Sequence, residues 1–254
     1  MKLIDWIAII GAFAWTPHLV GLIRYYLSKP EIRIITQNVV ELGFTTLGPI
    51  FNLRMAFSVK NKDLVISDIK IRLIHESGEE RFFDWQGITQ QMGKMTMPDA
   101  TAMPFEKEHS VLAIKLNLKD IEERFIKFQD PNFLAEQREY FQKALKKMTY
   151  LKNENKYDSE TFLREEEMTE LYNFNRRAFP WKIGKYKVCI QVQSPEKFTI
   201  VDNEMLFTLL PLHIEQLEEN KELLEEDYRN IIAPNQDELS KRNWKWVSPT
   251  LVKN

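Results

Sequence analysis

The first part of the chain is almost continuously apolar. Between residues 3 and 23 the only Asp, Glu, Lys or Arg is Asp5, and a helix of that length spans roughly 30 Å, about the hydrocarbon thickness of a bilayer. The pattern therefore predicts a single transmembrane helix inside an anchor of residues 1–29. The side chains expected to hold this anchor in the bilayer are Leu3, Trp6, Trp15, Leu22, Ile23 and Arg24.

Basic residues set the expected orientation of this anchor. Arg24, Lys29 and Arg33 follow the apolar segment, whereas only Lys2 precedes it. Because cytoplasmic flanks collect Lys and Arg, the prediction is a single-pass protein of the bacterial inner membrane with most of its chain in the cytoplasm. Membrane lipid is then an expected partner. A signal peptide cleaved near Ala12-Phe13-Ala14 is the main alternative, and a helix lying flat in the interface is a weaker one, since the segment has no charged face.

Beyond residue 30 apolar and polar side chains alternate, which is typical of strands with one buried face. The clearest case is the alternation of Phe51, Leu53, Met55, Phe57 and Val59 with smaller or polar residues. Strands are predicted over residues 31–37, 51–59, 69–75, 81–85, 110–117, 185–193, 198–200 and 205–210. We expect the second and third of these to form a hairpin, and the Met-rich residues 86–104 to form a long loop.

Helical spacing interrupts this pattern in the middle of the chain. Apolar residues recur at intervals of three and four from Ile121 onward, with Pro131 separating two stretches, and predict a helical insertion over residues 119–177. A further helix is predicted over residues 211–232, followed by a tail of residues 233–254.

These elements predict a mainly β fold of the α+β class, in which an antiparallel β-sandwich over residues 30–254 carries the insertion and a C-terminal helix. The strand Gly184-Lys-Tyr186-Lys-Val188 resembles the late Gly-x-Tyr-x-Val strand of immunoglobulin-like bacterial sandwich domains, and is similar to strands of arrestin-like sandwiches. The resemblance implies an immunoglobulin-like fold and no particular activity or ligand.

The amino-acid composition excludes several classes of function. A net charge of −2 gives no basic field for nucleic acid, and eight glycines are too few for a glycine-rich phosphate-binding architecture. The single cysteine, Cys189, excludes an internal disulfide and is expected to be structural. His18, His75, His109 and His213 show no metal-ligand spacing, and His75 is expected to be a hydrogen-bonded core residue. We therefore expect no metal, no cofactor, no catalytic residue and no small-molecule substrate.

Two groups of residues are candidates for contacts. Asp5, Gly11, Ala14 and His18 could mediate association between anchors. Trp244, Lys245 and Trp246 in the tail could dock at a membrane interface, or could form a tail strand covering the sandwich.

The leading hypothesis is a non-enzymatic interaction, scaffold or sensor module that holds an unknown protein partner, or copies of itself, at the inner face of the membrane. The insertion over residues 119–177 is its expected binding element. One alternative is a single-pass effector of a bacterial defence system whose clustered anchors perturb the bilayer. Another is a hydrolase whose site is assembled from distant residues.

Overall fold

The computed structural model describes residues 3–96, 102–109, 112–118, 120–232 and 243–253, with the backbone alone for residues 3–13, 88–96 and 102–109. Most strands belong to one sheet, whose main path runs in the order β11-β1-β3-β9-β6-β5-β10-β12-β14. The strands of this path are β1 (Glu31–Thr36), β3 (Gly48–Lys60), β5 (Asp68–His75), β6 (Glu80–Thr96), β9 (Ile121–Gln129), β10 (Gly184–Gln193), β11 (Thr199–Val201), β12 (Glu204–Leu209) and β14 (Val252–Lys253).

Further strands branch from or accompany this path. Strand β2 (Glu41–Thr45) pairs with β3 and with β13 (Trp246–Val247), and β7 (Ala102–His109) pairs with β6. Strands β4 (Leu64–Ile66) and β8 (Ile114–Leu116) form a separate two-stranded sheet.

The main sheet curls until its two ends meet. Strand β11 pairs with β1 at one end of the path and β12 pairs with β10 near the other, yet only Asp202 and Asn203 separate β11 from β12 in the chain. The rings of Phe51 on β3 and Phe207 on β12 consequently lie 6.4 Å apart, centroid to centroid. The inner face of the curl holds a continuous apolar core.

The expected immunoglobulin-like β-sandwich is therefore wrong, and the chain is a mixed α/β protein built on one large curled sheet. The physical reason is β6, which pairs first with β5 and then with β9. A register shift between Trp85 and Gly87 lies where β6 pairs with β9. The long strand β6 therefore joins into one sheet the strands that were expected to form the two separate sheets of a sandwich.

Three other predictions about strands are corrected by the pairing. Strand β5 pairs with β6 and β10, and not with β3 as the expected hairpin required. The backbone of residues 86–96 continues β6, and residues 88–96 pair with β7, where a loop was expected. Residues 121–129, expected to be helical, form β9 beside β3, because Ile126 and Phe128 alternate into the core.

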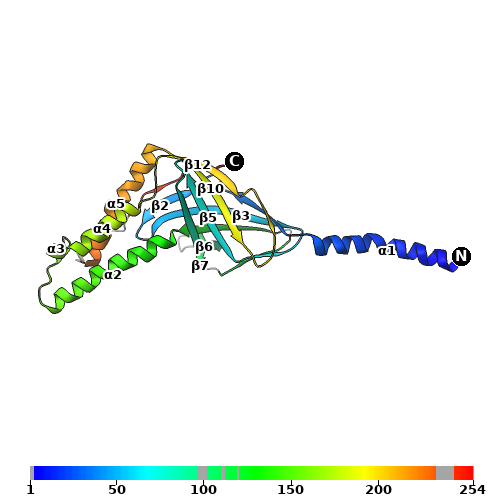
Figure 1. Cartoon of the computed structure of the whole chain (residues 1–254), viewed down its shortest axis with the longest axis horizontal. Helices are drawn as coiled ribbons and strands as arrows, with labels where there is room; N and C mark the ends of the chain where they lie inside the picture. Colours follow the sequence, from blue (N-terminus) through cyan, green and yellow to red (C-terminus); the bar gives the residue numbers. More distant parts are fainter. Residues whose placement is uncertain (1–2, 97–101, 110–111, 119, 233–242, 254) are drawn as a thin grey trace.

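The first helix, α1 (Leu3–Leu27), projects from one end of the sheet (Figure 1). Within the described residues, no helix is both long enough and apolar enough to cross a membrane. The described side chains of α1 begin only at Ala14, and Thr16, Pro17 and His18 interrupt their apolar run. The predicted transmembrane anchor over residues 1–29 and the single-pass inner-membrane localisation are therefore wrong.

The other long helices gather at the opposite end of the sheet (Figure 1). They are α2 (Pro131–Asn153), α4 (Glu166–Ala178) and α5 (Pro211–Ile232), with the short α3 (Ser159–Phe162) between α2 and α4. The predicted helix over residues 211–232 is confirmed by α5. The helical insertion begins at Pro131, after β9 has completed its pairing in the sheet.

Candidate functional site

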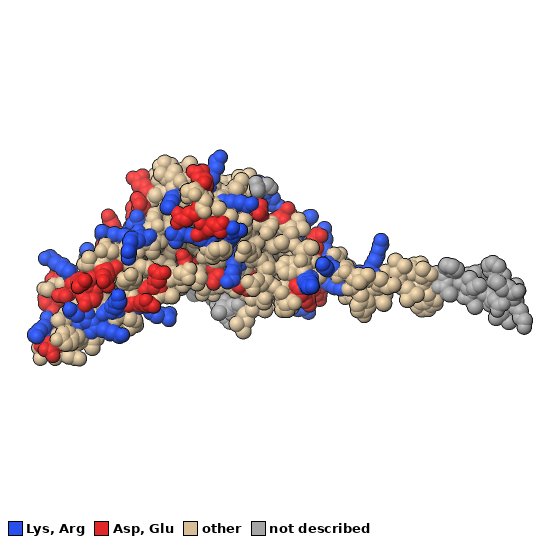
Figure 2. All heavy atoms as spheres, viewed as in Figure 1, with Lys and Arg blue, Asp and Glu red and all other residues tan. Residues whose placement is uncertain are grey.

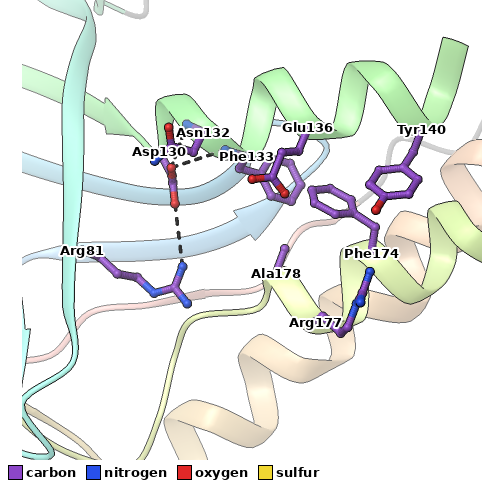
Figure 3. A pocket seen from close by; sticks show the side chains of 9 residues that line it. All are labelled: Arg81, Asp130, Asn132, Phe133, Glu136, Tyr140, Phe174, Arg177 and Ala178. Carbon is purple, nitrogen blue, oxygen red and sulfur yellow. Dashed lines mark hydrogen bonds and ion pairs between the residues drawn. The ribbon is translucent and has the colours of Figure 1, made fainter.

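A hollow in the described surface lies where α2 and α4 meet the sheet. It is a cleft of about 590 Å³, shown in Figure 3. Its lining residues come from β6, the start of α2 and the end of α4: Arg81, Asp130, Asn132, Phe133, Glu136, Tyr140, Phe174, Arg177 and Ala178. A second hollow of about 480 Å³ continues along the same two helices and shares Tyr140 and Arg177 with the first.

The end of the cleft nearest the sheet is fixed by the start of α2. Asp130 has an extended backbone, and its carboxylate accepts hydrogen bonds from the backbone N–H groups of Asn132, at 2.9 Å, and Phe133, at 3.3 Å. Pro131 follows at a position where a helix needs no N–H donor. The second carboxylate oxygen of Asp130 lies 3.8 Å from Nη1 of Arg81. The helix cap and this ion pair together anchor α2 to β6.

Aromatic rings form the floor of the cleft. Phe133 and Phe174 are buried with centroids 5.3 Å apart, and Tyr140 stacks on Phe174 at 4.9 Å. Phe133 also packs against the turn before β3, where Gly48 has a φ of +81°. A Cβ at Gly48 would lie 2.2 Å from the Phe133 ring, so glycine is required both for the backbone conformation and for the close approach of α2.

Most charged groups around the two hollows are neutralised by neighbours. Arg81 also pairs with Glu79, Glu170 with Lys143, and Arg176 with Glu225. Figure 2 shows Lys and Arg side by side with Asp and Glu over this helical end.

Two charged side chains of the cleft have no such neighbour. Arg177 on α4 and Glu136 on α2 are exposed, and neither makes an ion pair or hydrogen bond with the described residues. They come from different helices on either side of the aromatic floor (Figure 3). The cleft therefore presents one uncompensated cation and one uncompensated anion beside aromatic surface.

A polar seam lies behind the cleft, between α2, α4 and α5. Gln137 donates from Nε2 to the Tyr228 hydroxyl and to the Thr46 carbonyl, the latter at 3.1 Å. Burial raises the pKa of Tyr228 to about 12, although the nearby amides of Asn175 and Gln137 act in the opposite direction. Asn175 is 3% exposed, and neither of its amide atoms makes a hydrogen bond of good geometry. At Asn175 the contact between α4 and α5 therefore rests on packing, whereas Arg176 of α4 donates a hydrogen bond to Glu225 of α5 at 2.8 Å.

Among the described residues no group of three or more His, Cys, Asp or Glu side chains is placed to hold a metal ion. The two carboxylates that line the larger hollow differ in role, because Asp130 is committed to the helix cap and Glu136 is exposed. An aromatic floor with a few polar groups around it is typical of recognition sites of this size.

The tail residues selected from the sequence lie elsewhere, against α5 and β2. Asn220, fully buried on α5, accepts from the Lys245 N–H and donates to the Lys245 carbonyl, both at 2.8 Å. Trp246 begins β13, pairs with Gly43 of β2 and covers that glycine with its ring. The structure thus places Trp244, Lys245 and Trp246 in a tail that packs along β2 and α5, and Trp246 remains 41% exposed.

The residues expected in the anchor are far from the cleft. Trp15, Leu22, Ile23 and Arg24 are exposed on α1, as are Ala14 and His18. Leu3, Asp5, Trp6 and Gly11 belong to the part of α1 whose side chains lie outside the described residues. The structure brings none of the described ones to the α2–α4 cleft.

Two single residues behave as isolated structural groups. His75 is half-buried, its Nδ1 lies 2.8 Å from Ser77 Oγ, and its Nε2 lies 3.1 Å from the Ile183 carbonyl, which confirms that its ring is hydrogen-bonded. Burial, and then the Glu204 carboxylate, raise the pKa of the Cys189 thiol.

The cleft residues themselves were not selected from the sequence. Asp130-Pro131 is a recognisable helix start, and the spacing of Phe133, Gln137 and Tyr140 is helical, so the wall formed by α2 could have been found. Nothing in the sequence indicates that Glu136 and Arg177 face the same hollow while lacking partners.

Comparison of the chain with models of known protein families, with curated proteins and with solved structures gave no match. The resemblance of residues 184–188 to a sandwich strand therefore stays a prediction. Any functional assignment rests on the residues and geometry of the chain itself.

Proposed function

We propose that this chain is a protein-interaction module whose binding element is the helical unit formed by α2 and α4. The observation that supports it most strongly is the pair of free charges, Arg177 and Glu136, beside the aromatic floor of the α2–α4 cleft. Exposed arginine and aromatic side chains around a hollow are typical of the residues that dominate binding energy in protein interfaces.

The position of the helical unit in the fold also supports the proposal. The strand β9 on one side of it and β10 on the other are paired within the sheet, so the inserted helices are not needed to complete the ladder. The helices are held to the sheet by the Asp130–Arg81 pair and by the packing of Phe133 against Gly48. Such a unit can present side chains to a partner from a rigid base.

Site-specific photo-crosslinking tests this function. A photoreactive amino acid replaces Asn173, an exposed residue of the smaller hollow, and in a matched variant it replaces Glu222, an exposed residue of α5 outside both hollows. We expect a defined protein adduct from position 173 in cells that express the full chain, and none from position 222. Adding Arg177→Glu should abolish the adduct, whereas Arg138→Glu, on an exposed part of α2 outside the cleft, should leave it intact.

The experiment has outcomes that contradict the proposal. Equal adducts from positions 173 and 222 would show that contact is not confined to the cleft. An adduct that survives Arg177→Glu, or the absence of any adduct from position 173, would exclude the cleft as the binding element.

A further inference from the structure

The two hollows lie next to each other along the seam between α2 and α4, and we call them together the trough. Tyr140 and Arg177 line both hollows. The lining residues of α2 run from Asn132 to Tyr140 and those of α4 from Glu170 to Ala178. At about 1.5 Å per helical residue each wall is roughly 12 Å long, which matches about four residues of an extended chain.

The charges of the trough are separated across its width. Glu136 stands on the α2 wall and Arg177 on the α4 wall, with Phe133 and Phe174 between them and Tyr140 about one turn further along α2 (Figure 3). A ligand of one sign would satisfy one of these groups and leave the other beside it uncompensated. A ligand that carries both signs, separated by an apolar group, would satisfy both.

The surroundings favour a bound polypeptide. Other charges that line the trough are already neutralised by ion pairs, Arg81 with Asp130 and Glu170 with Lys143. Arg177 and Glu136 are therefore the charges left to pair with an incoming chain. The exposed amides of Asn132, at one end of the trough, and Asn173, within the α4 wall, can exchange hydrogen bonds with a peptide backbone.

Building on the proposed function, we infer that the trough binds a short extended segment of a partner protein that carries an acidic residue, an apolar residue and a basic residue. The acidic side chain pairs with Arg177, the apolar side chain contacts the edge of the Tyr140 ring, and the basic side chain pairs with Glu136. The geometry requires the two charges to lie within about four residues of each other in the segment.

Selection of a displayed library of random 12-residue peptides on the full chain tests this inference. The expected result is enrichment of peptides in which Asp or Glu lies within about four residues of Lys or Arg, with an apolar residue between them. Binding of a selected peptide, measured by fluorescence anisotropy, should weaken at least about tenfold in Arg177→Glu and in Glu136→Lys, since each change replaces an attraction by a repulsion. The double variant should regain binding to a peptide in which the two charges are exchanged.

Two variants control for the general charge of the helical end. Arg138→Glu and Glu222→Lys make the same changes of charge at exposed positions outside the trough, and binding should stay within about twofold of the unchanged chain. Enrichment of peptides without paired charges, no enrichment at all, or equal losses in the control variants would overturn the inference.

The two proposals fail separately in these experiments. If position 173 crosslinks a partner but no short peptide is selected, the trough binds a folded surface, and only the inference about an extended segment is wrong. If a selected peptide binds in the trough but no partner crosslinks in cells, the proposed function is wrong while the recognition chemistry stands.

Discussion

At the scale of single residues, Cys189 illustrates how burial and a neighbouring carboxylate raise the pKa of a thiol. Its Sγ lies 3.7 Å from Oε1 of Glu204, and both burial and that charge raise the pKa of the thiol above its usual value. Because the thiolate is the nucleophile, a raised pKa lowers the fraction of reactive thiolate at neutral pH.

The thiol should therefore react with iodoacetamide more slowly than free cysteine at pH 7.5, with a rate that rises only at alkaline pH. Removing the carboxylate charge in Glu204→Gln should lower the pKa of Cys189 and increase the rate. Asp68→Asn, which disturbs the ion pair of Lys70 on the neighbouring strand, serves as the control and should not change the rate. A fast reaction of the unchanged chain at pH 7 would contradict this account of the site.

Gly48 is a second residue whose replacement has a predictable effect on stability. Gly48→Ala should lower the free energy of unfolding by about 2–4 kcal/mol, because the new Cβ meets both a positive φ and the Phe133 ring. Gly78→Ala has a similar φ of +87° but nothing within 4 Å of the new Cβ, and should cost only about 1–2 kcal/mol. Urea unfolding measures both, and equal losses would show that α2 does not pack closely on the turn before β3.

At the scale of elements, the tail is attached to α5 by the buried side chain of Asn220, beside an exposed ion pair between Lys245 and Glu219. The Asn220 amide satisfies both backbone groups of Lys245, which makes it a substitute for a strand neighbour. Asn220→Ala should leave these part-buried groups without their protein partner and cost about 1 kcal/mol of stability.

Hydrogen exchange at Lys245 and along β13 should accelerate in this variant, because the tail loses its support on α5. Glu222→Ala on the exposed face of the same helix is the control and should leave that exchange unchanged. Unchanged exchange in Asn220→Ala would show that pairing with β2 alone holds the tail.

Elements with a strong period were predictable from the sequence. Strand β3 alternates as expected, with Phe51, Leu53 and Phe57 fully buried, and α5 follows its predicted bounds to within one residue. Strand β9 was not predictable, because Ile121, Phe125 and Phe128 also fit a helical spacing, and only pairing with β3 and β6 selects the extended form. The local pattern of apolar residues does not show with which strand a segment will pair.

At the scale of the whole molecule, the curl of the sheet depends on contacts between residues far apart in the chain. The pairings of β11 with β1 and of β14 with β12 form the two ends of the sheet, and neither pairing can be read from the period of apolar residues. The number of strands in the sequence suggested a sandwich of two sheets. Strand β6 pairs with both β5 and β9, and this joins all of these strands in one sheet. The same limit applies to α1, because apolar length alone led to the prediction of a membrane anchor that the described residues do not support.

The candidate site shows this limit most clearly. Sequence pattern predicted an inserted helical element and assigned partner binding to it, but the cleft depends on Arg81 from β6 meeting Asp130 at the start of α2. The cleft also depends on α4 packing beside α2, so that Phe174 stacks on Tyr140. A deletion of residues 119–177 would remove β9 from the middle of the sheet, so point variants in the cleft are the appropriate test of the element.

The most direct test of the central claim is hydrogen exchange of the full chain, alone and with its crosslinked partner isolated and added back. We expect slower exchange confined to residues 131–140 and 170–178, the two walls of the α2–α4 cleft. Protection confined to the sheet, to α5 or to the tail, with unchanged exchange in both walls, would contradict the account.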